Sequence, residues 1–169
     1  MNRLLVLALF FTGSAAAGDH SHLVKTVTAN LPGPVEVSAR YQTASAGEVN
    51  PDSTPAGKFM NVWAASLQVS EDVRSGATEI PAGRYTVGLI KKDSSDWTLA
   101  LYPGRLGQKE AVVTPKMVLL DTLFSRSSGR SEHLAIDFNL GTGRFEGEVV
   151  LTFHLGTLYF EMPLEALGE

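Results

Sequence analysis

Apolar and polar residues alternate along much of the chain, which is typical of β-strands that bury one face. The clearest alternation lies near the C-terminus, in three successive segments at 133–140, 145–155 and 158–164. Gly141-Thr142-Gly143-Arg144 separates the first two segments, and Gly156-Thr157 separates the last two, as hairpin turns do. The sequence therefore predicts a three-stranded antiparallel meander over 133–164.

The two turns also predict which residues face each other. A four-residue turn at 141–144 pairs Leu140 with Phe145, and a two-residue turn at 156–157 pairs Phe153 with Phe160. Apolar side chains then meet apolar side chains on one face. Since a slip by one residue would turn every side chain to the other face, this match supports the register.

The same register creates two poor pairs. On the apolar face Phe138 meets Gly147, and on the other face Asp137 lies opposite Glu148. Like charges directly across a ladder are unfavourable. A local error in the register, screening by solvent or a bound cation would each explain the acidic pair.

Upstream segments show similar patterns. We expect strands at 35–42 and 59–69, and a hairpin of 84–92 with 96–102 around Asp93-Ser94-Ser95. Residues 117–124 are apolar and fit a strand or a short helix, whereas 43–55, 70–79 and 125–131 are polar and fit loops, with a turn at Ser75-Gly76. About eight strands at short spacing predict an all-β antiparallel β-sandwich over 35–165, without internal repeats.

The first residues have the three parts of a signal peptide. Met1-Asn2-Arg3 is basic, residues 4–11 are an unbroken apolar run, and residues 12–17 are small and end in an Ala-x-Ala cleavage site. The alternative is a buried N-terminal helix. The run is too short for a membrane span, which needs roughly 20 apolar residues. We expect cleavage after Ala17, a flexible segment at 18–34, and a periplasmic or secreted protein without a membrane span.

Composition narrows the possible partners. The formal net charge is −4, and loss of Arg3 with the signal peptide makes it −5. This argues against a nucleic-acid partner, because phosphate binding needs a basic surface. The chain has no cysteine, so packing alone must hold the domain even in an oxidising compartment that permits disulfides. A partner would be an envelope protein or a small ligand.

Catalytic motifs are absent from the sequence, including a Gly-x-Ser-x-Gly elbow, a P-loop and a dinucleotide fingerprint. A Ser-His hydrolase would need His133 or His154, and neither lies in a motif. The meander brings His133, His154 and Glu161 together on its outer face, where they could ligate a metal. The alternative is an ordinary solvated sheet face.

A sharper metal hypothesis concerns the new N-terminus. Cleavage after Ala17 exposes Gly18-Asp19-His20. The α-amine, two deprotonated backbone amides and the imidazole can hold Cu(II) or Ni(II) in a square plane, with His22 as an axial or second ligand. Cleavage after Ala16 would weaken this site, and the alternative is an unstructured polar tail.

The segment Ile80-Pro81-Ala82-Gly83-Arg84-Tyr85 reads as a turn followed by an aromatic core anchor. Together with Asp96-Trp97-Thr98-Leu99 it resembles signatures of the bacterial family described as domain of unknown function 2911. The early strand at 35–38 and the closing strands at 151–164 are also similar to that family. The resemblance covers roughly 35–164 and implies an exported β-sandwich, with no established activity.

The sequence also departs from that family. Members commonly carry a Trp-Arg-x-Gly-Ala-Asn-Glu segment, and residues 57–64 match it only at Asn61. A polar site built on the missing Arg and Glu would therefore be absent here. We expect a non-enzymatic binding or structural module of the cell envelope. The alternatives are an envelope hydrolase, for which Trp63, Trp97 and Tyr102 are the available cleft aromatics, and copper binding through the mature N-terminus.

Overall fold

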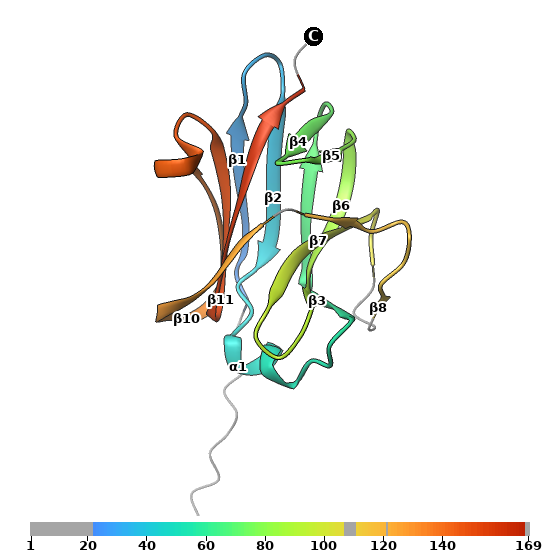
Figure 1. Cartoon of the computed structure of the whole chain (residues 1–169), viewed down its shortest axis with the longest axis vertical. Coiled ribbons are helices and arrows are strands. Elements are labelled where there is room, and N and C mark those ends of the chain that lie inside the picture. Colours follow the sequence, from blue (N-terminus) through green and yellow to red (C-terminus); the bar gives the residue numbers. More distant parts are fainter. Residues whose placement is uncertain (1–21, 107–110, 121, 168–169) are drawn as a thin grey trace, which may run out of the picture.

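Two antiparallel β-sheets pack face to face in the computed structural model, which describes residues 22–106, 111–120 and 122–167 (Figure 1). The predicted all-β sandwich is confirmed. The described strands of the larger sheet are β1 (Val24–Asn30), β2 (Glu36–Gln42), β3 (Lys58–Val69), β6 (Gly83–Lys91), β7 (Trp97–Pro103), β8 (Ala111–Val112) and β9 (Val118–Leu119). Those of the smaller sheet are β10 (Leu123–Leu140), β11 (Val149–Ala166), β4 (Val73–Ser75) and β5 (Thr78–Ile80).

The strands of the larger sheet follow the order β1-β2-β3-β6-β7-β9, with β8 paired to β3, and the smaller sheet has the order β10-β11-β4-β5. Short helical turns join some of them: α1 (Ala46–Val49), η1 (Pro51–Ser53) and η2 (Gly143–Phe145). The described strands outnumber the eight or so that the sequence predicts, because short strands such as β4, β5, β8 and β9 carry too few residues to show a period.

The core fills the space between the sheets. Trp97, Phe153 and Phe160 are fully buried there. The two phenylalanine rings meet edge to face with centroids 5.8 Å apart, and each large apolar side chain contributes about 1.5–3 kcal/mol through burial. Since the chain has no cysteine, this packing takes the place of covalent links.

A second apolar cluster lies apart from this core and consists of Phe59, Ile90, Ala100 and Met117. Gly88 lies directly beneath the Phe59 ring. A Cβ atom at Gly88 would come within 2.3 Å of Phe59 Cζ, so the ring can pack against the β6 backbone only because residue 88 has no side chain.

The predicted hairpin of residues 84–92 and 96–102 is confirmed. β6 pairs with β7 from Tyr85↔Pro103 to Lys91↔Trp97. The Asp93 carboxylate organises the turn by accepting hydrogen bonds from the backbone N–H groups of Ser95 (2.7 Å) and Asp96 (2.9 Å). These bonds lower the pKa of Asp93 below its ordinary value because they stabilise the ionised form.

The aromatic anchor predicted at Tyr85 is buried at the start of β6. Its hydroxyl donates a 2.6 Å hydrogen bond to the carbonyl oxygen of Pro81, four residues earlier. This is the arrangement called a tyrosine corner in β-sandwiches. Gly83 lies inside the corner with φ of 155°, which favours glycine. Burial, followed by the charge of Asp72, raises the pKa of Tyr85.

The turn predicted at 156–157 is confirmed, whereas the pairing predicted around the turn at 141–144 is wrong. His154 and Tyr159 have ring centroids 5.5 Å apart on the outer face, and Phe153 and Phe160 meet on the inner face. Residues seven apart would lie roughly 23 Å apart in a straight strand. The chain of β11 therefore reverses at Gly156, whose φ is 61°, as the sequence predicts.

The predicted register of the preceding hairpin is wrong by four positions. Leu140 pairs with Val149 instead of Phe145, and residues 141–148 form the connection, with η2 inside it. Because the shift is even, the apolar face remains the apolar face. Gly147 lies in the connection with φ of 88°, and Asp137 faces Thr152, so both poor pairs of the predicted register disappear.

Two other predictions need correction, and one open choice is decided. Residues 24–30, expected within a flexible segment at 18–34, form β1 and pair with β2 along their whole length. Residues 125–131, expected as a loop, belong to β10 but at a register irregularity. Residues 117–124, for which a strand and a short helix were both open, form strand at 118–119 in β9 and at 123–124 in β10, and the other described residues of this segment are in neither a strand nor a helix.

Candidate functional site

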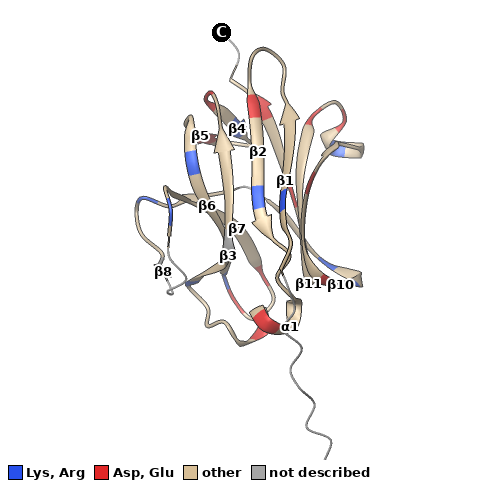
Figure 2. Ribbon diagram, turned by 180° about the vertical axis from the view of Figure 1, so that it is seen from behind, with Lys and Arg blue, Asp and Glu red and all other residues tan. Residues whose placement is uncertain are grey.

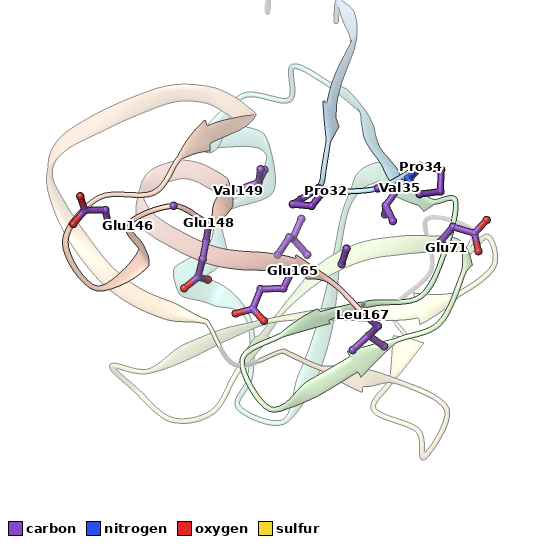
Figure 3. Close-up of a pocket in the computed structure, with 13 residues that line it drawn as sticks. Pro32, Pro34, Val35, Glu71, Glu146, Glu148, Val149, Glu165 and Leu167 are labelled. Atoms are coloured by element: carbon purple, nitrogen blue, oxygen red, sulfur yellow. The ribbon is translucent and has the colours of Figure 1, made fainter. Parts of the chain in front are cut away.

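A cavity of about 770 Å³ opens at the end of the sandwich that carries the C-terminus (Figure 3). Its walls come from four separate parts of the chain: the β1–β2 connection, the segment before β4, the end of the β10–β11 connection and the end of β11. The lining residues are Pro32, Gly33, Pro34, Val35, Glu71, Glu146, Gly147, Glu148, Val149, Leu164, Glu165, Ala166 and Leu167.

Local backbone geometry shapes these walls. Gly33 and Gly147 have φ of 79° and 88°, so each allows a turn that other residues rarely make. Two hydrogen bonds between Glu36 and Ser70 tie the β1–β2 side to the segment before β4: Ser70 N–H to the Glu36 carbonyl at 3.0 Å and Glu36 N–H to Ser70 Oγ at 2.8 Å. The walls are therefore held by turns and backbone contacts.

The cavity combines an apolar surface with carboxylates. Among the described residues of its lining, every ionisable side chain is a glutamate, and acidic positions mark the loops at this end of the molecule (Figure 2). In Figure 3, Glu148 and Glu165 extend to the same side of the cavity, whereas Glu146 and Glu71 point away from it at its two edges.

One arginine stands beside this acidic group. Arg74 of β4 forms an ion pair and a hydrogen bond with Glu165. This contact raises the pKa of the arginine, and Glu79 and Glu148 add weaker electrostatic attraction. Arg144, on the nearby η2 turn, lies over the ring of Phe145 instead, with 4.4 Å to the ring centroid.

The cavity provides binding chemistry more readily than nucleophilic chemistry. The described residues that line it include no Ser, Thr, His, Lys or aromatic residue. A carboxylate pair could act as acid and base in glycoside hydrolysis. However, two of the aromatic residues that the sequence offered for a hydrolase cleft lie elsewhere: Trp97 is fully buried in the core and Tyr102 packs against the second cluster. The side chain of the third, Trp63, is outside the described part of the chain.

Of the N-terminal metal site suggested by the sequence, the structure describes only His22. Gly18, Asp19 and His20 fall outside the described residues. His22 is described, and both ring nitrogens have neighbours: Nδ1 lies 3.2 Å from the Thr43 carbonyl oxygen and Nε2 lies 3.6 Å from Glu48 Oε1. The described imidazole is therefore already engaged at the α1 end of the sandwich.

The three-residue constellation on the outer face is not assembled. His154 packs against Tyr159, whereas His133 lies opposite Ser45, and Glu161 pairs with Leu123. Within the described ranges, no group of three or more His, Asp or Glu side chains is placed to hold a metal ion. Burial, followed by the charge of Glu161, raises the pKa of Tyr159.

Sequence reasoning missed the cavity. Of its four glutamates only Glu148 drew attention, as half of an unfavourable pair, and the wrong register hid its true surroundings. No sequence period connects residues 32–35, 71, 146–149 and 164–167, so the signal exists only in the folded chain.

No protein-family model, curated protein or solved structure matches this chain. The likeness to domain of unknown function 2911 therefore remains an expectation from the motifs. Among the described residues, no helix is long and apolar enough to cross a membrane.

Proposed function

We propose that this chain is an exported, non-enzymatic β-sandwich module of the cell envelope that binds a small ligand in the cavity at its C-terminal end. The observation that carries the proposal is the cavity itself. A volume of about 770 Å³ lies within the range of pockets that hold small molecules, and such pockets combine apolar walls with a few polar groups.

The placement of the cavity supports this proposal. It lies where two sheets and three connections meet, so a rigid scaffold positions residues from distant parts of the chain. The apolar walls provide area for contact, and the carboxylates provide direction and specificity. Export rests on the signal-peptide pattern of residues 1–17, which lie outside the described residues.

Native mass spectrometry of the exported protein tests both parts of the proposal. The expected result is a chain that begins at Gly18 and carries a small-molecule adduct. Ala166→Trp should remove the adduct, because the indole would occupy the cavity next to Leu167. Ala135→Trp, at an exposed position on β10, is the matched control and should retain it. An adduct that persists in the Ala166→Trp protein would place the ligand elsewhere.

The hydrolase alternative has one supporting observation, the shared direction of Glu148 and Glu165 (Figure 3). It is tested by incubating the protein with envelope polysaccharide and peptide and following products over time. The binding proposal predicts no turnover. Product formation that Glu148→Gln abolishes would replace the proposal with an enzymatic function.

A further inference from the structure

We infer that the ligand of the cavity is a small amphipathic cation, an ammonium or guanidinium group attached to a hydrocarbon body. This inference rests on the proposed function and specifies its ligand. The hydrocarbon body follows from the walls, where Val35, Val149 and Leu164 present apolar surface. The positive charge follows from Glu148 and Glu165, whose side chains extend to the same side in Figure 3, and among the described lining residues the ionisable side chains are all glutamates.

Glu148 is the carboxylate best placed to receive the cation. Within the described part of the chain it forms no ion pair, whereas Glu165 is already paired with Arg74. Glu148 and Glu165 extend to the same side in Figure 3, and Glu148 is close enough to Arg74 to raise its pKa. A cation next to Glu148 would therefore also be attracted by Glu165 and would compensate the excess negative charge.

The charge balance also argues against other ligand classes. An anion would be repelled by Glu148 and Glu165, and the guanidinium of Arg74 beside them is already engaged by Glu165. A neutral apolar ligand would leave Glu148 partly desolvated without a partner, which is unfavourable. The volume of about 770 Å³ suits a small molecule better than a folded partner.

Isothermal titration calorimetry with three probes of equal chain length separates these classes. The probes are hexylamine, which is cationic at neutral pH, hexanol and hexanoate. We expect hexylamine to bind at least about three-fold more tightly than hexanol, as one partly exposed charge pair allows, and hexanoate to bind most weakly. Raising the NaCl concentration should remove most of the preference for hexylamine, because salt screens exposed charges.

Two variants test whether Glu148 causes the preference for hexylamine. Glu148→Gln keeps the size of the side chain and should remove the preference for hexylamine over hexanol while hexanol binding is retained. Glu132→Gln removes the same charge from an exposed position near the opposite, α1 end of the sandwich and should leave the preference intact. Circular dichroism of both variants verifies that they are folded.

The outcomes test the cationic nature of the ligand separately from the binding function of the cavity, on which it rests. Equal binding of hexanol and hexylamine, unaffected by Glu148→Gln but lost in Ala166→Trp, would overturn the cationic ligand and retain the binding cavity. No binding of any probe would overturn both. Tighter binding of a trilysine peptide than of hexylamine, with the same dependence on Glu148, would replace the small cation with a basic polypeptide.

Discussion

Replacing Gly88 with alanine tests how closely the second apolar cluster packs against the larger sheet. Gly88 pairs with Asn61 and Ala100 in the middle of β6. An added Cβ would lie 2.3 Å from Phe59 Cζ and 2.6 Å from the backbone oxygen of Met60. Real Cβ atoms essentially never approach other atoms so closely, so the substitution forces a movement.

The size of the effect follows from what has to move. The Phe59 ring is buried against Ile90, Ala100 and Met117, and the Met60 oxygen belongs to a strand that pairs with β6, so neither can yield easily. Overpacking of this kind costs about 1–3 kcal/mol, and we expect a value near the top of that range. The lower entropy of the unfolded alanine chain returns about 0.5–1 kcal/mol, which leaves a net loss of about 2 kcal/mol.

Thermal and urea unfolding, followed by circular dichroism, measure this loss. A domain of this size loses roughly 3 °C of melting temperature for each kcal/mol, so Gly88→Ala should melt about 6 °C lower than the parent. Gly129→Ala is the matched control, because a Cβ at that exposed position of β10 meets nothing closer than Ser127 Oγ at 3.8 Å. Its stability should be unchanged or slightly raised.

A melting temperature for Gly88→Ala within about 1 °C of the Gly129→Ala value would refute the reasoning. It would mean that Phe59 does not lie over the β6 backbone. The double variant Phe59→Leu with Gly88→Ala provides an independent check. Since the smaller leucine leaves room for the new methyl group, the double variant should lose less stability than the two single variants lose together.

The remaining predictions concern the corner, the hairpin turn and the N-terminus. Tyr85→Phe removes the hydrogen bond to Pro81 and should lower the free energy of unfolding by about 1 kcal/mol in urea titrations, and an unchanged value would show that the hydroxyl does not hold the corner. The pKa of Asp93 is lowered on folding, so its ionised form stabilises the fold. The stability difference between the parent and Asp93→Ala should therefore be present at neutral pH and shrink as the pH falls below about 4, and a difference that grows with acid would contradict this sign. Protein that begins at Gly18 should give a visible absorption band that saturates near one equivalent of Cu(II) and disappears in His20→Ala, and absence of the band in the parent would refute the copper site.

The alternation of side chains correctly located most long strands and the contact of Phe153 with Phe160 across the 156–157 turn. It could not fix the register between β10 and β11. A shift by four positions keeps apolar residues facing apolar residues, so Leu140 with Phe145 and Leu140 with Val149 satisfy the same pattern. The clues that the sequence did give were the two poor pairs, and both disappear in the observed register.

β1 was missed for a different reason. It is an edge strand whose side chains are mostly exposed, so it has little alternation for a pattern to detect. Only its hydrogen bonds to β2 define it. The tyrosine corner, in contrast, was predictable in outline, because a Pro-x-Gly turn followed by an aromatic residue has local causes.

The candidate site was not predictable from sequence at all. Histidine side chains were candidates because they can ligate metals and act in catalysis, yet His22, His133 and His154 lie outside the cavity. Glutamates such as Glu71 and Glu165 look like ordinary surface residues along the chain. Their significance arises only because four separate segments meet at one end of the sandwich.

The most direct test of a ligand site at this end is a titration of the ¹⁵N-labelled mature protein with hexylamine, followed by amide chemical shifts. The account predicts saturable changes concentrated in residues 33, 35, 146–149 and 164–167, with residues 131–135 at the α1 end unaffected. Saturable changes confined to the α1 end, or the absence of any saturable change, would contradict the account.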